Sequence, residues 1–252
     1  MTSQAPLFGA TGRTDDAHVL ADLEVDYTPV AVAVQLLLAL RDHGFLGDDC
    51  TRALDPAAGS GCWGRAMRAV LGPIPDIVGV EPRQAEEDNL RQAYNHSFVL
   101  PLECFIECVR GPVEPFDLIV TNPPFTEAFE GYWPVVFRSA GLVAPGGLVA
   151  FYGLSQWGQS AQAAASLRAW APSLQLRCGG RNAHRADGKT DSREYSLWVW
   201  DVEDRHRLGR PRWYTEQLPE LPLEMRRWSP AAVPGTYPVE PALVEEIRRR
   251  YL

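Results

Sequence analysis

The sequence predicts an α/β fold in which helices flank a mostly parallel sheet, and two features of the chain support this prediction. Short apolar runs that stop at Gly, Pro or an acidic residue alternate with segments of helical periodicity, which is typical of βαβ units. In addition, the largely apolar run in residues 116–120 is soon followed by Asn122, Pro123 and Pro124, and two consecutive prolines continue neither a helix nor a strand ladder. The chain therefore leaves the sheet there, at a strand end of the kind where open α/β sheets bind ligands.

Length and charge limit the classes of function. The chain has 252 residues and 46% hydrophobic content, which is enough for one domain with a sizeable core and an additional tail. A net charge of −8 and a pI near 5.2 argue against tight nucleic-acid binding by overall charge, although they allow a locally basic face.

Cysteine usage and hydropathy indicate the compartment. The five cysteines form no CxxC pair and have no histidine nearby at ligand spacing, so we expect no metal site and a reduced environment. The longest apolar run, residues 30–40, is too short to span a membrane and lacks the basic flank of a signal peptide. We therefore expect a cytoplasmic protein without a membrane partner.

The N-terminal part predicts an arm followed by a helix. Residues 1–24 show no periodicity and are expected to form a flexible arm ahead of a domain that spans residues 25–202. A first helix is predicted after Tyr27, with Thr28 as its N-cap and Pro29 at its first helical position. Apolar residues at helical spacing continue it toward Gly44, a pattern that by itself is typical of a helix packed on a core.

A glycine-rich turn in residues 53–64 joins a short strand, ending at Asp55, to a second helix. Gly59 and Gly61 allow the backbone to approach a ligand closely and allow N–H groups at the helix start to face it. The turn lacks the GK[ST] ending of a P-loop and does not match the GxGxxG dinucleotide fingerprint. A glycine-rich turn alone does not identify the ligand.

The second strand, residues 76–81, ends at Glu81. A carboxylate at this position can accept hydrogen bonds from both ribose hydroxyls of a bound nucleoside. Alternatively, it can stabilise the dipole of the following helix, residues 84–95. The next strand is predicted in residues 97–105.

The remaining segments complete a predicted seven-stranded sheet. A helix is expected in residues 132–142, followed by a turn in residues 145–147 and a strand in residues 148–154. A further helix is expected in residues 161–171. Strands in residues 174–177 and 194–202, joined by the polar loop 178–193, predict a β-hairpin at the sheet edge. Residues 203–252 are expected to be a C-terminal extension packed on or near the domain, with a final helix in residues 241–252.

The hairpin loop and its flanks carry a local excess of positive charge. Residues 168–212 contain ten Arg and Lys against six Asp and Glu. Such a charge-mixed segment is either a solvated face or a surface that contacts phosphates. Arg181, Arg185 and Lys189, within the loop, are the candidate substrate contacts.

Asn122 and its neighbours carry the most specific motif. Asn122 offers an amide oxygen on a backbone that the following proline restricts to extended geometry, and Phe125 supplies a flat apolar face beside it. Together they can hold a planar group that bears an NH2. The tetrapeptide NPPF resembles the [N/D/S]PP[Y/F/W] catalytic loop of S-adenosylmethionine-dependent methyltransferases that modify exocyclic or amide nitrogen.

Two further motifs extend this resemblance. DPAAGSG, residues 55–61, resembles the loop that holds the methionine moiety of the cofactor in amino-methyltransferases. The YTP segment at Tyr27 resembles the one that precedes this loop in many adenine methyltransferases. Because the motifs occur in the family's order across residues 27–202, the chain resembles the S-adenosylmethionine-dependent adenine-N6 DNA methyltransferases.

The resemblance implies a Rossmann-like class I methyltransferase fold, with a mostly parallel seven-stranded sheet and a C-terminal β-hairpin, S-adenosyl-L-methionine as cofactor and DNA as substrate. Glu103, or Glu107 in a shifted register, stands nearest to where the family places an Asp against the cofactor adenine, which is a departure from the pattern. Because the C-terminal extension is too short for a sizeable recognition domain, a protein partner is one way to supply target recognition. The residues implied for catalysis are Asn122, Pro123, Pro124 and Phe125, and those implied for cofactor binding are Tyr27, Thr28, Pro29, Asp55, Pro56, Ala57, Gly59, Gly61, Glu81, Glu103 and Asn122.

Two alternatives stay open at this stage. NPP[Y/F] loops also serve methyltransferases that act on RNA guanine amines or on protein glutamine, so the chemistry can be the same with another substrate. The fold can also be retained as a binding module without catalysis.

Overall fold

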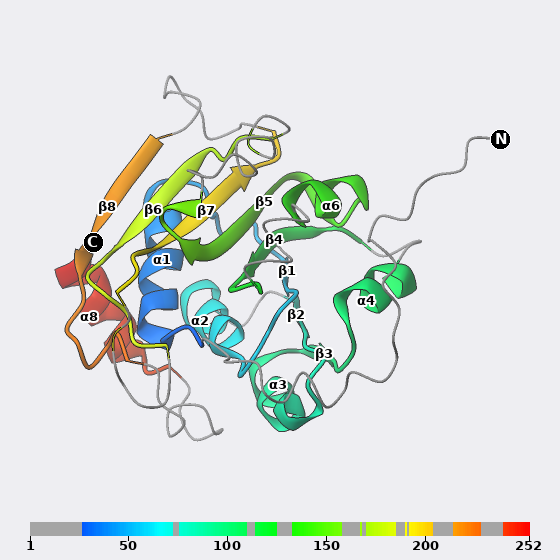
Figure 1. Ribbon diagram of the computed structural model, residues 1–252, viewed down its shortest axis with the longest axis horizontal. Helices are drawn as coiled ribbons and strands as arrows, with labels where there is room; N and C mark the ends of the chain where they lie inside the picture. Colours follow the sequence, from blue (N-terminus) through cyan, green and yellow to red (C-terminus); the bar gives the residue numbers. More distant parts are fainter. Residues whose placement is uncertain are drawn as a thin grey trace.

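An eight-stranded sheet in the order β3-β2-β1-β4-β5-β7-β6-β8 forms the centre of the protein (Figure 1). The computed structural model describes residues 27–72, 76–109, 114–124, 133–157, 167, 170–184, 190, 192–203, 214–227 and 239–252. The strands are β1 (Arg52–Asp55), β2 (Asp76–Val80), β3 (His96–Phe98), β4 (Phe116–Thr121), β5 (Val143–Leu154), β6 (Leu174–Gly179), β7 (Tyr195–Asp201) and β8 (Tyr214–Glu220).

Strand directions confirm the mostly parallel sheet and the hairpin. Strands β1 to β5 pair in parallel, whereas β7 lies between β5 and β6 and runs antiparallel to both. The hairpin expected from residues 174–177 and 194–202 is therefore β6 and β7. Its second strand returns into the sheet beside β5, where Tyr195 pairs with Leu154, so the loop between β6 and β7 ends beside the end of β5.

The eighth strand was not predicted from the sequence. Strand β8 pairs in parallel with β6 at the sheet edge, and its alternating exposure leaves Leu218 buried while most of its side chains reach solvent. The segment lacks a run of apolar or β-branched residues and contains Pro219, which is tolerated at an edge because no neighbour needs its N–H. Local composition therefore does not predict this strand, which pairing with β6 stabilises.

The third strand is shorter than the sequence predicted. The expectation of a strand over residues 97–105 is wrong beyond Phe98, because helix α4 (Leu102–Val109) begins there. Leu102, Phe105 and Ile106 lie at i, i+3 and i+4 and are all buried, which is the spacing of a helix face and not of a strand. The apolar residues of this short segment had been assigned the wrong period.

The turn expected at residues 145–147 lies inside β5. Phe116 pairs with Val143, but Leu118 pairs with Leu148, so β5 contains extra residues at a bulge. Gly146 has a φ of 73°, a conformation that favours glycine. The interruption therefore bends the strand and does not end it.

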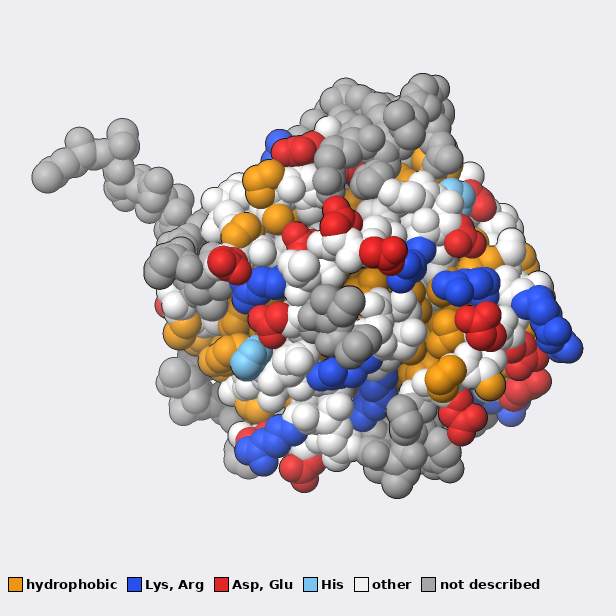
Figure 2. Space-filling view, turned by 180° about the vertical axis from the view of Figure 1, so that it is seen from behind, with side chains coloured by type: hydrophobic (Ala, Val, Ile, Leu, Met, Phe, Trp, Pro, Cys, Tyr) orange, Lys and Arg blue, Asp and Glu red, His pale blue; other side chains and the backbone are white. Residues whose placement is uncertain are grey.

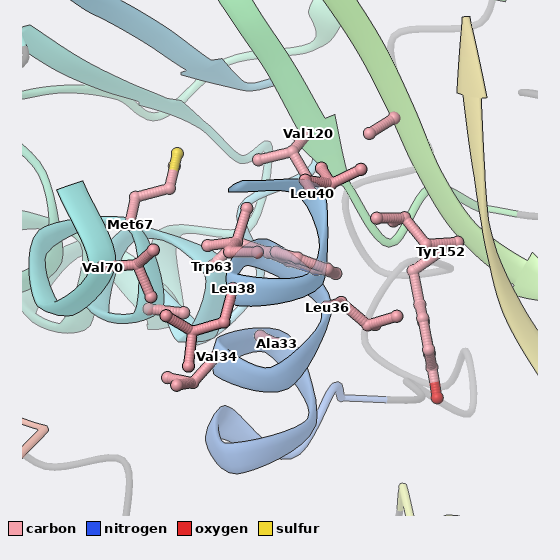
Figure 3. Packing of buried hydrophobic residues seen from close by; sticks show 14 of the residues in the cluster. Ala33, Val34, Leu36, Leu38, Leu40, Trp63, Met67, Val70, Val120 and Tyr152 are labelled. Atoms are coloured by element: carbon pink, nitrogen blue, oxygen red, sulfur yellow. The ribbon is translucent and has the colours of Figure 1, made fainter. Parts of the chain in front are cut away.

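Helices cover both faces of the sheet. One buried cluster joins the sheet to α1 (Val30–Asp42), α2 (Cys62–Leu71), α3 (Glu87–Ala93) and α8 (Pro241–Tyr251), and the other joins it to α4 and α6 (Trp133–Ser139). Figure 3 shows Val34 of α1 on the side of Val70 of α2, and Leu36 on the side of Tyr152 of β5. No helix among the described segments is long and apolar enough to cross a membrane.

Helix α1 is buried between the sheet and the C-terminal elements. All residues from Ala31 to Leu40 are buried, and the amide of Gln35 donates to the carbonyls of Pro219 (2.9 Å) and Tyr251 (3.1 Å). These two hydrogen bonds join the end of β8 and helix α8 to α1, and α8 lies beside α1 in Figure 1. The C-terminal extension thus contacts the core through Gln35, in addition to the apolar contacts of α8.

The predicted start of the first helix and the predicted helix 84–95 both need correction. Helix α1 begins at Val30 with Pro29 at the N-cap, so the predicted N-cap role of Thr28 is wrong; no side-chain hydrogen bond caps this helix. The helix 84–95 is split into the 3-10 helix η2 (Gln84–Glu86) and α3. The arm in residues 1–24 and most of the helix expected in residues 161–171 lie outside the described residues.

Candidate active site

The predicted site residues converge at the carboxyl ends of three neighbouring strands. β1 pairs with β4 through Leu54 and Ile119, and with β2 through Asp55 and Gly79. Since parallel strands advance together, Asp55 and the turn that follows it lie beside the exit of β4 at Asn122. Glu81 directly follows β2 on the other side of β1. The sheet therefore brings these residues to one edge.

The turn after β1 is fixed by backbone hydrogen bonds. Ala58 N–H donates to the Val80 carbonyl (2.9 Å), which ties the turn to the end of β2. Gly61 N–H donates to the Ala58 carbonyl (2.8 Å), and Gly59 N–H donates to Glu81 Oε2 (2.9 Å). The turn and the acid at the end of β2 thus form one unit.

The two glycines of the turn have different surroundings. Both have positive φ, 51° at Gly59 and 84° at Gly61. A Cβ on Gly61 would lie 2.6 Å from the Cβ of Ala93, so this glycine is required for close packing against α3. At Gly59 the nearest neighbours of a Cβ are the Tyr27 ring at 3.6 Å and the Arg83 guanidinium at 3.7 Å, both long side chains at the site. Gly59 therefore lies beside Tyr27 and Arg83 without the close packing that Gly61 makes.

Asp55 lies beneath the turn and is fully buried. The Tyr94 hydroxyl donates to Asp55 Oδ2 (2.7 Å) and accepts the Gly64 N–H (3.2 Å). Burial raises the pKa of Asp55 to about 7, against the opposing effect of the hydrogen bonds that it accepts, including the one from Tyr94. Because no part of its side chain reaches solvent, Asp55 acts on the site through the turn above it.

Tyr94 is a structural residue of the site that the sequence did not predict. A Cβ on Gly64 or on Gly79 would lie 2.6 Å from the Tyr94 ring, so both glycines make room for it. A glycine inside a strand, such as Gly79 in β2, often marks the close approach of another group. That signal was present in the sequence, but it did not identify the group.

Glu81 contacts both the turn and Arg83, the residue before the following helical segment. Its carboxylate is 4% exposed and accepts Gly59 N–H, Arg83 N–H (3.1 Å) and Arg83 Nε–H (2.6 Å). The helical segment begins at Gln84 with Arg83 as its N-cap, so Glu81 also accepts the backbone N–H at this helix terminus. Three of about four acceptor positions on the carboxylate are in use.

Tyr27 lies against the same unit. Its hydroxyl donates to Glu86 Oε1 (2.5 Å) and accepts from Arg83 (3.2 Å), whose guanidinium carbon lies 5.6 Å from the centre of the ring. Burial, strengthened by the bond to Glu86, raises the pKa of Tyr27 to about 12. The adjacent Thr28 Oγ1 is buried and has no hydrogen-bond partner in the part of the chain that the structure describes.

The remaining predicted residues are placed unequally. Asn122 is half-buried, Pro123 is buried and Pro124 is exposed, while Phe125, Arg185 and Lys189 lie outside the described residues. Glu103 is half-buried in the first turn of α4, and Arg181 is exposed at the start of the hairpin loop. The structure thus places Pro56, Ala57, Gly59 and Gly61 in the turn, where Tyr27, Glu81 and Asp55 contact it, and Asn122 at the exit of the neighbouring strand β4. Thr28 and Pro29 follow Tyr27 at the start of α1.

A pH titration of stability tests the buried state of Asp55. Because its folded pKa of about 7 exceeds the ordinary value of about 3.9, the folded state binds more protons between these pH values. Stability from this group is fully present below pH ~4 and is lost as pH rises through about 7, by at most roughly 1.4 kcal/mol per pH unit. Wild type should therefore lose stability relative to Asp55→Asn over this range, as measured by urea unfolding. Asp88→Asn, at a carboxylate that is 91% exposed, is the control, and parallel pH profiles of Asp55→Asn and wild type would contradict the assignment.

Comparisons with known proteins identify the fold. No family model matches the sequence, and no curated protein sequence is similar to it. Among solved structures, a protein of Listeria monocytogenes assigned to the class I S-adenosylmethionine-dependent methyltransferases matches with a TM-score of 0.52 at 12% identity, over 88% of this chain and 70% of that one. A protein of Pyrococcus horikoshii assigned as an RNA methyltransferase matches with a TM-score of 0.50 at 16% identity, over 75% of this chain and 98% of that one. The chain therefore has the Rossmann-like fold of the class I methyltransferases.

Proposed function

We propose that this protein is an S-adenosyl-L-methionine-dependent methyltransferase that methylates the exocyclic amine of adenine in DNA. The observation that carries the proposal is the pairing of β1 with β4, which puts Asn122 beside the Gly59 turn. One ligand at this edge can contact both. An amine held at Asn122 would then lie next to a cofactor held at the turn.

The residues around the turn fit this cofactor. Gly59 keeps its positive φ without a Cβ on the site side, and Thr28 Oγ1 is a buried polar atom that lacks a partner within the described residues. Glu81 presents a buried carboxylate at the position expected for the ribose hydroxyls. Because Arg83 occupies two of its acceptor positions, accepting both hydroxyls requires one of these hydrogen bonds to give way.

The proposed chemistry needs positioning and hydrogen-bond acceptors from the protein. The cofactor, when bound, supplies an electrophilic methyl group. The Asn122 amide oxygen and the Pro123 carbonyl accept hydrogen bonds from the N–H groups of the target amine. These hydrogen bonds leave the nitrogen lone pair free to attack the methyl group. These bonds strengthen as positive charge develops on the nitrogen, so they act mainly in the transition state. The proline after Asn122 restricts its backbone and keeps the acceptor in place.

With DNA as the substrate, the segment after β4 contacts the target base and the hairpin loop contacts the phosphates. An adenine must leave the duplex to reach Asn122, at a cost of a few kcal/mol, and stacking on Phe125 would return about 1 to 3 kcal/mol. Arg181, Arg185 and Lys189 are assigned to phosphates. On the face shown in Figure 2, basic and acidic side chains of the described residues are interspersed, so we assign phosphate contacts to the hairpin loop and not to that face.

The substrate class is tested by transfer of a labelled methyl group. The protein is incubated with radiolabelled S-adenosylmethionine and, in parallel, with DNA, RNA and protein, and the methylated atom is identified by mass spectrometry. Label on adenine N6 of DNA is the expected result. Label confined to RNA or to a protein amide would overturn the substrate, and cofactor binding without transfer to any substrate would favour a non-catalytic binding module.

Replacing Gly59 tests the cofactor turn. Gly59→Val forces a β-branched residue to a φ of 51° and places its side chain toward Tyr27, so affinity for S-adenosylhomocysteine, measured by calorimetry, should fall at least about tenfold. Gly44→Val is the matched control, since Gly44 has a φ of 75° with no atom within 4 Å of a Cβ. It carries the backbone strain at a distance from the turn and should bind as wild type does. Equal affinity of both variants would place the cofactor elsewhere.

Replacing Asn122 separates catalysis from binding. Asn122→Ala should lower turnover by roughly 10²- to 10³-fold at saturating substrate and cofactor, because a preorganised acceptor is lost in the transition state. Asn122→Asp keeps an acceptor and should retain more activity, and cofactor affinity should change little in either variant. Gln92→Ala, which removes an exposed amide from α3, is the control. Wild-type turnover in Asn122→Ala would make the Pro-Pro turn purely structural.

A further inference from the structure

Residues 181–184, at the start of the loop between β6 and β7, hold the backbone of Tyr27. Tyr27 N–H donates to the His184 carbonyl (3.1 Å), and His184 Nδ1 lies 3.0 Å from the Tyr27 carbonyl. Because a carbonyl only accepts, Nδ1 must carry a proton in this contact. Both backbone polar groups of Tyr27 are therefore bound by one residue that lies 157 positions away in the sequence.

A buried chain of hydrogen bonds orients the imidazole. His184 Nε2 lies 3.4 Å from the Tyr152 hydroxyl, which accepts from the Asn182 amide (2.7 Å). Asn182, Tyr152 and His184 are each at most 3% exposed. The Tyr195 ring packs against the His184 ring, with 4.3 Å between the ring centroids, and stacks on the Tyr152 ring, with 5.3 Å between the centroids. The ring of His184 is thus held by hydrogen bonds at its edge and by aromatic contact on its surface.

The C-terminal extension supports the segment from the other side. Ala183 N–H donates to the Arg226 carbonyl (2.8 Å), and the buried Arg226 guanidinium donates to the carbonyls of Arg181 and Leu221. A Cβ on Gly180, whose φ is 75°, would lie 2.7 Å from Arg226 Nη1, so glycine is required for this approach. The contacts run from the C-terminal extension through residues 181–184 to Tyr27.

We propose that His184 is a positioning residue for the cofactor site, and that the C-terminal extension holds it in place. His184 fixes the backbone of Tyr27, whose ring lies against Gly59 and whose hydroxyl binds Glu86 and Arg83. Through Arg83, the same contacts reach the Glu81 carboxylate. The inference rests on the proposed function in taking the Gly59 turn as the cofactor site. It adds a role for the hairpin loop and the C-terminal extension, which lie outside the motifs of the sequence.

Three substitutions at position 184 test the proposal. The amide nitrogen of His184→Asn can replace the Nδ1–H donor to Tyr27, whereas His184→Gln extends toward the Nε2 position and His184→Ala provides neither. Affinity for S-adenosylhomocysteine, measured by calorimetry, should be close to wild type in the Asn variant and about 5- to 10-fold weaker in the Gln and Ala variants, as expected for one lost hydrogen bond to the site. Thermal unfolding without ligand is measured in parallel.

A second pair of variants removes only a hydroxyl. Tyr152→Phe breaks the chain that orients His184 and should weaken the same affinity, while Tyr251→Phe on α8 should not. If affinity follows thermal stability alone, with the Asn and Gln variants equally impaired, His184 is merely structural and the inference fails. Wild-type affinity in His184→Ala would also overturn it. Absence of binding by the wild-type protein is a different outcome, which overturns the proposed function together with the inference.

Discussion

The buried hydrogen bond from Tyr94 to Asp55 is the contact on which the geometry of the site depends. It joins the end of β1 to the residue after α3, and the Gly64 N–H that binds the same hydroxyl adds the start of α2. A carboxylate with no solvent contact would be costly without such partners. Asp55 also accepts the Ala57 N–H (3.3 Å), so the same side chain holds the first residues of the turn.

Above this foundation, Tyr27 connects three parts of the chain that are far apart in sequence. Its side chain binds the residues after β2, its ring covers the glycine turn, and its backbone is held by the hairpin loop. The C-terminal extension contacts the hairpin loop through Arg226 and contacts α1 through Gln35. A segment with no recognisable motif therefore supports the wall of the candidate site.

Much of the fold could be predicted because its signals are local. Apolar runs that end at Gly, Pro or acidic residues identified β1, β2, β4 and β5, and the spacing of the last two apolar runs identified the β6–β7 hairpin. The failures also have local causes. The short apolar segment at the start of α4 is too brief to show its helical period, and β8 has the composition of an exposed edge. Neither segment is long enough for periodicity alone to decide.

The sequence by itself determined most strands of the sheet, the glycine turn and the order of Tyr27, Asp55, Glu81 and Asn122 along the chain, because strand ends and turns follow from neighbouring residues. Only the tertiary structure decided how these residues are supported. Tyr94 lies 39 positions from Asp55, and His184 lies 157 positions from Tyr27. The two partners of Gln35 lie 184 and 216 positions away, and no local pattern encodes such pairs. It also showed that Gly61 packs closely against Ala93 of α3, whereas Gly59 lies beside the longer side chains of Tyr27 and Arg83, since that difference depends on which side chain another element brings to each glycine.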